Sequence, residues 1–209
     1  MTPDDVRRSA ETPDRAVEAD LPGVAKDLSD AFSTDPHFDW FLRNDAGRDA
    51  ARAAMFRHMI GVMAWPDARI DRPKEGGAAA VWMPFEWLKP PTLMEELRGA
   101  PVMLRATGLG RIRRLMAIRA GMNRHHPMKQ RHAYLWFLGV TPQLQGMGIG
   151  SRLLRAGTDR LDAEGLPAYL ETGTTRNVAL YRRHGFEVIH EAPPAPGAPV
   201  MWHMWRDPA

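Results

Sequence analysis

Cysteine is absent from all 209 residues of the chain. The chain therefore cannot form a disulfide, a thiolate-rich metal site or a covalent cysteine intermediate. Long apolar runs are missing too, since none approaches the roughly 20 residues that a helix needs to span a bilayer. The first residues, Met1 to Asp5, lack the basic and then apolar pattern of a secretory signal. We therefore expect a cytoplasmic protein without a membrane partner.

Acidic residues are absent between Arg98 and His132, where basic residues are frequent: Arg105, Arg111, Arg113, Arg114, Arg119, Arg124, Lys129 and Arg131. Such a run is usually a solvated helix face, and the alternative is a patch for a phosphate group or an acidic partner. The formal charge of +3 and the pI near 9.6 suit an anionic cofactor. They fall short of the concentrated basic surface of a nucleic-acid binder, so we expect no nucleic-acid partner.

Apolar residues make up 44% of the chain, which is enough to fill one core. We expect a mobile polar tail at residues 1–12 and a single domain at 13–209, without internal repeats. The patterns of the first two thirds predict a strand at 15–18, a helix capped by Asp20, an aromatic connection at 38–42, a helix at 47–64, a hairpin of strands at 68–72 and 78–83, and one or two helices between 90 and 122.

The last third has the clearest pattern, with strands and helices in alternation. Strands are predicted at 134–140, 168–171, 186–190 and 200–205, and helices at 149–164 and 177–183. This order predicts an α/β unit with locally parallel strands.

A turn with three alternating glycines, Gly146, Gly148 and Gly150, leads into the helix at 149–164. The first N–H groups of a helix have no intrahelical acceptor, and glycine lets an anion approach them, so the turn suits phosphate oxygens. The alternative is that the glycines only permit a tight turn or close helix packing. A Walker loop ends in Gly-Lys-Ser/Thr, whereas this chain has Ile149-Gly150-Ser151 and lacks the lysine. A dinucleotide-binding fingerprint would need a glycine where Leu153 stands.

The sequence Gln145-Gly146-Met147-Gly148-Ile149-Gly150 resembles the phosphate motif of the GCN5-related N-acetyltransferase (GNAT) superfamily. Asn177, Tyr181 and Gly185-Phe186 resemble its second signature. Shorter stretches, at 80–84, 170–172 and 202–204, look like the puromycin N-acetyltransferase group. The resemblance covers 134–205 well, and it implies acetyl-CoA as cofactor. It also implies an α/β (α+β) fold with a mixed six- to seven-stranded sheet, splayed between strands 4 and 5 and flanked by helices.

The resemblance also implies which residues bind the cofactor: Leu138, Gly139 and Val140 with the pantetheine arm, Gln145, Gly146, Met147, Gly148, Ile149, Gly150 and Ser151 with the phosphates, and Asn177 and Tyr181 from one helix face. The main chain at Leu138 to Val140 could also polarise the thioester carbonyl. Tyr181 is a candidate general acid for the coenzyme A thiolate, and the alternative is a tyrosine of the core.

Direct transfer without a covalent enzyme intermediate needs a base for the attacking amine, and Glu171 at the end of a strand is the first candidate. The alternative is that Glu171 caps the next helix. Asp35, His126 and His203 are further candidates, although a lone histidine is more often structural. The adjacent pair His125-His126 does not have the spacing of metal ligands, so we expect no metal site.

Five aromatic residues are candidates for an acceptor pocket: Phe38, Trp40, Phe85, Trp87 and Trp136. Asp35 is a further candidate for contact with the acceptor. Core packing is the alternative for each of the aromatic residues. We expect a small amine, aromatic or antibiotic-like, as the acceptor. A protein or peptide acetyltransferase and a non-catalytic acetyl-CoA sensor remain open, as does a homodimer.

Overall fold

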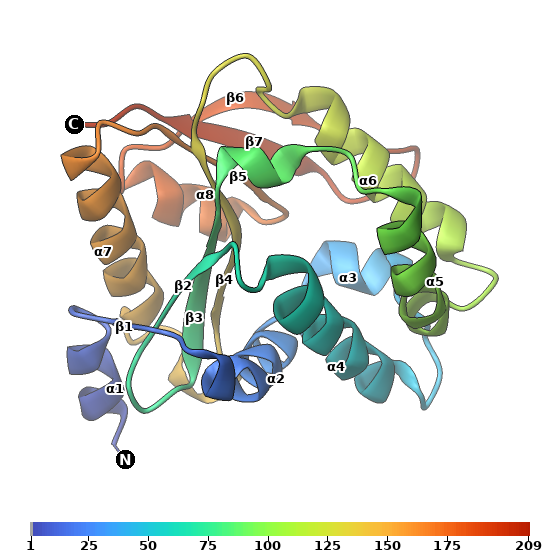
Figure 1. Cartoon of the computed structure of the whole chain (residues 1–209), viewed down its shortest axis with the longest axis horizontal. Coiled ribbons are helices and arrows are strands. Elements are labelled where there is room, and N and C mark those ends of the chain that lie inside the picture. Colours follow the sequence, from blue (N-terminus) through green and yellow to red (C-terminus); the bar gives the residue numbers. More distant parts are fainter. Residues whose placement is uncertain (1) are drawn as a thin grey trace.

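The computed structural model describes residues 2–209, and within them seven strands form one mixed sheet (Figure 1). Their bounds are β1 Asp14–Arg15, β2 Arg69–Arg72, β3 Ala78–Met83, β4 Ala133–Val140, β5 Ala168–Thr172, β6 Glu187–Ala192 and β7 Met201–Arg206. Their order is β1-β2-β3-β4-β5-β7-β6. β4 and β5 are parallel, and the other neighbours are antiparallel. The predicted mixed sheet and the β2–β3 hairpin are confirmed.

Helices cover both faces of the sheet. They are α1 Pro3–Ser9, α2 Leu21–Ala31, α3 Pro36–Phe41, α4 Arg48–His58, α5 Leu93–Thr107, α6 Ile112–His125, α7 Ile149–Ala163 and α8 Thr175–Arg182, with short helical segments at Glu18–Asp20, Met59–Ala64, Phe85–Leu88 and Pro142–Leu144. α7 lies on one side of the sheet, and α2 to α6 lie on the other (Figure 1). Across residues 2–209, each helix is too short or too polar to cross a membrane.

β4 and β5 diverge after a short parallel contact. Ala133 pairs with Ala168, and Tyr134 pairs with Tyr169. Beyond Tyr134, β4 continues to Val140 with β3 on one edge and, in the described part of the chain, without β5 on the other. The structure therefore has the predicted splay, which leaves main-chain N–H and C=O groups of β4 without a strand partner on that edge.

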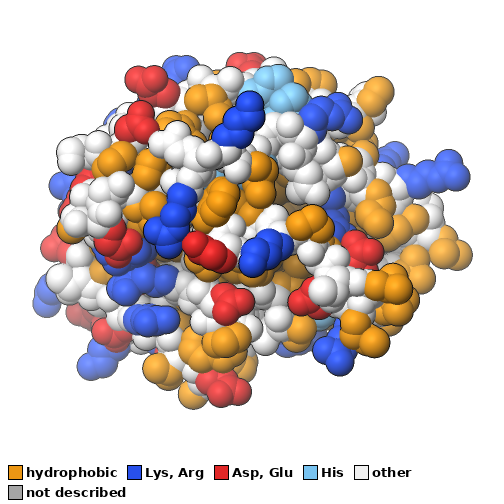
Figure 2. Space-filling view, turned by 45° about the horizontal axis from the view of Figure 1, so that its top comes forward, with side chains coloured by type: hydrophobic (Ala, Val, Ile, Leu, Met, Phe, Trp, Pro, Cys, Tyr) orange, Lys and Arg blue, Asp and Glu red, His pale blue; other side chains and the backbone are white. Residues whose placement is uncertain are grey.

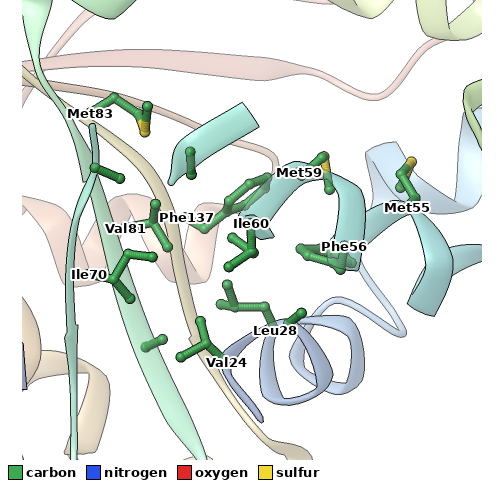
Figure 3. Close-up of a cluster of buried hydrophobic side chains, with 14 of the residues drawn as sticks. Val24, Leu28, Met55, Phe56, Met59, Ile60, Ile70, Val81, Met83 and Phe137 are labelled. Carbon is green, nitrogen blue, oxygen red and sulfur yellow. The ribbon is translucent and has the colours of Figure 1, made fainter. Parts of the chain in front are cut away.

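The larger core fills the space between the sheet and the helices α2 and α4 (Figure 3). Leu28 of α2, Phe56 of α4 and Ile60 lie against Val81 of β3 and Phe137 of β4. All of these side chains are buried. This apolar layer holds α2 against the splayed end of β4.

A second core lies on the opposite face of the sheet, under α7 and α8. Leu153 and Leu154 of α7 pack with Leu170 of β5 and Phe186, and the ring of Tyr181 belongs to the same cluster. The apolar spacing of α7 that the sequence shows therefore fixes one side of this helix on the sheet. The start of α7 is thereby placed next to the end of β4.

Three predictions about the first half of the chain are wrong. The expected tail contains α1, which a capping box between Thr2 and Asp5 starts and which buries Val6. The aromatic connection is a short helix, α3, because the Asp35 carboxylate accepts hydrogen bonds from the N–H groups of the first turn. Asp20 makes no side-chain cap to α2, since its carboxylate instead accepts from the Val17 N–H and from Arg72.

Several arginines of the basic run have structural contacts. The Arg111 guanidinium donates to the Leu42 carbonyl at 2.6 Å, and that of Arg114 donates to the Trp40 carbonyl at 3.0 Å. These bonds satisfy carbonyls at the end of α3 and tie α6 to it. Basic and acidic side chains are intermixed on the face shown in Figure 2. The contacts favour a structural role for these arginines.

Candidate functional site

The start of α7 presents unpaired N–H groups. Gly148 is its N-cap in the left-handed conformation, with φ 76°, and Gly146 has φ 81°. The first main-chain bond of the helix runs from the Arg152 N–H to the Gly148 carbonyl, at 3.2 Å. The N–H groups of residues 149–151 precede it, so they have no intrahelical acceptor and suit an anion.

The glycines near this helix start have different roles. A Cβ on Gly146 would meet open space, whereas a Cβ on Gly150 would lie 3.3 Å from Val140. A Cβ on Gly139 would lie 2.7 Å from Leu28. Gly146 and Gly148 therefore shape the turn, and Gly150 and Gly139 allow close packing, so both alternatives from the sequence apply, each to different glycines.

Gln145 connects the turn to the end of β4. Its side-chain Nε2 donates to the Val140 carbonyl at 3.0 Å. The Ser151 hydroxyl lies 2.7 Å from Nε2 of His184, in the segment that follows α8. The predicted phosphate residues thus form one continuous corner with β4 and the α8 region.

Tyr181 and Asn177 lie on α8, one turn apart. The side chain of Thr174 caps this helix by accepting from the Asn177 N–H at 3.2 Å, so the cap role considered for Glu171 belongs to Thr174. Tyr181 is 6% exposed. Burial, and then the Asp35 carboxylate, raise the pKa of Tyr181 well above its ordinary value. The phenol is therefore protonated throughout the physiological range.

Asp35 lies at the start of α3, close enough to Tyr181 to act on its pKa. Its Oδ1 accepts from the His37 N–H at 2.9 Å and the Phe38 N–H at 3.1 Å. Burial raises the pKa of Asp35, while these N–H groups lower it. The residue acts as a helix cap, and His37 beside it packs against Gly173 just after β5.

Glu171 lies in a buried group of tyrosines and histidines. The Tyr169 hydroxyl donates to its Oε1 at 2.9 Å, and His126 Nδ1 lies 3.7 Å from the same oxygen. The Glu171 side chain is 5% exposed. Burial and this carboxylate raise the pKa of Tyr134 well above its ordinary value. Tyr169 and Glu171 are two residues apart on β5 and therefore share the sheet face opposite α7 and α8.

His203 completes this group from β7, where it is the register partner of Glu171. Its Nδ1 lies 2.5 Å from the Tyr169 hydroxyl. Burial lowers the pKa of His203 to about 4. The rings of His125 and His190 stack at 3.7 Å and lie at 5.3 and 5.4 Å from that of His203.

The structure divides the aromatic acceptor candidates between two groups. Phe38 stacks on Phe56 with 5.3 Å between the ring centroids, and the Arg114 guanidinium lies over the Trp40 ring, 5.4 Å from its centroid. On the other side, Trp136 contacts Trp87 at 4.9 Å. The ring of Phe85 lies 5.3 Å from that of the buried His132. Phe38 and Trp40 therefore extend the core around α3 and α4, whereas Phe85, Trp87 and Trp136 lie away from them.

Tyr134, Tyr169 and His132 were not among the sequence candidates. A signal existed for Tyr169, because its spacing of two from Glu171 in a predicted strand places both on one face. The signal for Tyr134 and His132 depends on the register between β4 and β5, which the sequence does not contain.

The fold and the helix start at the splayed sheet have counterparts among known proteins. Residues 105–186 match the Acetyltransferase (GNAT) family. The fold is shared along most of the chain with a Corynebacterium glutamicum protein described as histone acetyltransferase HPA2 and related acetyltransferase, with 27% identity, a TM-score of 0.69, and 93% and 94% of the two chains covered. The chain therefore has the GNAT fold.

More distant structures share the fold alone. Arylalkylamine N-acetyltransferase 2 from Aedes aegypti is 10% identical with a TM-score of 0.59, and covers 94% of this chain and 98% of its own. Mycothiol acetyltransferase from Arthrobacter sp. is 46% identical over 55 residues, which are 25% of this chain. The matches span 17% of that relative and 21% of its Paenarthrobacter aurescens counterpart.

Substituting Gly148 is expected to weaken acetyl-CoA binding. In Gly148→Ala the left-handed N-cap is strained, and the new Cβ lies 2.7 Å from the Arg152 guanidinium. We expect a Kd for coenzyme A raised about tenfold, on the order of 1.4 kcal/mol, measured by calorimetry. Gly165→Ala is the matched control, since Gly165 has φ 60° at the other end of α7 and an open Cβ position. Equal losses of affinity in both variants would contradict an anion site at Gly148.

Proposed function

We propose that the chain transfers the acetyl group of acetyl-CoA directly to the amine of a small molecule. One observation carries the proposal: the unpaired N–H groups at the start of α7 and the unpaired edge of β4 meet at one corner of the splayed sheet. A phosphate group and an amide-bearing arm are what such a corner can bind together.

The donors at this corner fit coenzyme A. The N–H groups of residues 146–151 would hold the pyrophosphate, and the free edge of Leu138 to Val140 would pair with the pantetheine amides. Gln145 keeps the two parts in register through its bond to the Val140 carbonyl. When bound, the cofactor supplies an acetyl thioester and a thiol leaving group. The main-chain groups of β4 are available to stabilise negative charge on the reacting carbonyl.

Acid and base functions come from opposite faces of the sheet. Tyr181 belongs to the core under α7 and α8, whereas Glu171 contacts the tyrosines and histidines of the other face. Glu171 takes the proton of the attacking amine, and Tyr181 protonates the departing thiolate. The splay lets the two groups act on one reaction centre from two sides.

A small-molecule acceptor is supported by two observations. The Glu171 group is enclosed by aromatic rings, among them those of Tyr134 and His126, as befits a compact apolar amine. The local match to mycothiol acetyltransferases, whose names state a small thiol, points the same way. The puromycin-like stretches around Trp82, Glu171 and His203 fit this class as well.

A peptide acceptor is the second candidate, because the Corynebacterium glutamicum protein is described as a histone acetyltransferase. A thiol-release assay with acetyl-CoA and a library of amines distinguishes the two. We expect coenzyme A release with small aromatic or amphipathic amines and little with lysine peptides. Preferential turnover of peptides would replace the small-molecule proposal, and cofactor binding without any release would indicate a sensor.

A further inference from the structure

A continuous hydrogen-bonded path leads away from Glu171 through two further buried side chains. Its Oε1 accepts from the Tyr169 hydroxyl at 2.9 Å, and that hydroxyl lies 2.5 Å from Nδ1 of His203. Tyr169 and His203 are buried. The core needs no such chain for packing, since a phenylalanine and a leucine would fill the same space without polar atoms.

We propose that Tyr169 and His203 form a proton relay that carries the proton of the acceptor amine from Glu171 toward the ring pair of His125 and His190. This inference rests on the proposed acetyl transfer and extends it to residues that do not touch the reacting atoms. Tyr169 and His203 are therefore relay and positioning residues, and Glu171 is the group that meets the amine.

The proton balance of the relay is closed. The acceptor nitrogen forms a bond to the acetyl carbon, the carbon–sulfur bond breaks, and the nitrogen gives one proton to Glu171. Once Glu171 is protonated, its own hydroxyl donates to the Tyr169 oxygen, and the Tyr169 hydroxyl turns to donate to Nδ1 of His203. Glu171 then gives its proton to the Tyr169 oxygen, while Tyr169 gives its hydroxyl proton to Nδ1. The imidazolium formed loses one proton from Nε2, and exchange of the Nδ1 proton for one on Nε2 restores the starting tautomer. One proton enters the path and one leaves, and the thiolate receives a separate proton from Tyr181.

His203 has the surroundings that such a step needs. Burial keeps its pKa low, so the resting imidazole is neutral and its imidazolium releases a proton readily. The stacked rings of His125 and His190 are partly exposed and lie beside it. The titratable groups that face Glu171 and His203 are Tyr134 of β4, Tyr169 of β5, His190 of β6, His37 of α3, His125 of α6, and His126 and His132, which follow α6.

The matched variants separate proton transfer from positioning. In His203→Asn the side-chain amide keeps a donor close to the Nδ1 position but cannot pass a proton. Tyr169→Phe keeps the ring and removes the hydroxyl. His58→Asn is the control, because His58 is a half-buried ring at the end of α4, beside Gly99 of α5 and outside the path.

The experiment measures kcat with an amine that the wild-type protein acetylates, in a weak buffer, together with the Kd for coenzyme A. We expect kcat to fall about tenfold or more in His203→Asn and Tyr169→Phe at an unchanged Kd, and to stay within twofold in His58→Asn. Added imidazoles should restore His203→Asn with a rate that depends on the pKa of the imidazole, which space filling alone would not produce.

Each outcome decides between the two levels of the proposal. If wild-type protein acetylates no amine, the proposed function fails. If it is active and His203→Asn retains wild-type kcat, the relay is wrong and acetyl transfer stands. A loss of kcat that imidazoles do not restore, or restore regardless of their pKa, also overturns the relay. Tyr169→Phe then gives an independent check, since an unchanged kcat in this variant contradicts the relay as well.

Discussion

Tyr181→Phe is expected to lower kcat about 1000-fold while leaving the Kd for coenzyme A nearly unchanged. The substitution removes only the hydroxyl, and general acid catalysis typically contributes 10²–10⁴-fold. The phenol ring packs in the second core with Phe186, at a ring distance of 5.8 Å, and this contact is retained in the variant. Single-turnover measurement of coenzyme A release separates the chemical step from binding.

The pH dependence provides a control within the wild-type protein. Burial and Asp35 raise the pKa of Tyr181, so the acid form persists to higher pH than in a free tyrosine. We therefore expect kcat to show no decline from Tyr181 ionisation up to about pH 10, the ordinary value for tyrosine. A wild-type kcat in Tyr181→Phe would show that the hydroxyl is not the acid.

Glu171→Gln is expected to lower kcat/KM for the amine about 100-fold at neutral pH. Glutamine keeps the size of the side chain and can still accept from the Tyr169 hydroxyl, but it cannot take a proton. At high pH the amine is already neutral, so the difference in kcat/KM between the variant and the wild type should narrow. The measurement is a pH series of kcat/KM for one amine.

Glu191→Gln is the matched control for this substitution. Glu191 is an exposed carboxylate on β6, so its replacement should leave kcat/KM unchanged. Equal activity of Glu171→Gln and wild type across the pH series would contradict a base at Glu171. The candidates Asp35 and His126 would then have to be tested in its place.

The last third of the fold was predictable because its signals are local. Short runs of apolar residues mark β4, β5 and β7, and the spacing of Leu153, Leu154 and Leu161 marks α7. In the first third, polar composition concealed α1 and a short aromatic-rich stretch concealed α3, although both carry a cap that the sequence contains, the Thr2–Asp5 box and Asp35 before Pro36. A cap can outweigh composition when one or two apolar side chains find a buried place.

The candidate site was predictable in part for the same reason. The turn from Gln145 to Gly150 and the pair Asn177 and Tyr181 are motifs of neighbouring residues. The partners of Glu171 are different, because they depend on long-range register: Tyr134 lies opposite Tyr169 across the parallel pair, and His203 lies opposite Glu171 across the antiparallel one. No local pattern in one sequence sets these registers.

Amide hydrogen exchange with and without coenzyme A tests most directly whether the corner of α7 and β4 holds the cofactor. The account predicts slower exchange at residues 146–151 and along the free edge of residues 136–140, with unchanged rates in β6, residues 187–192, as the internal control. Saturating coenzyme A that leaves both segments unprotected, or protects β6 instead, would contradict it.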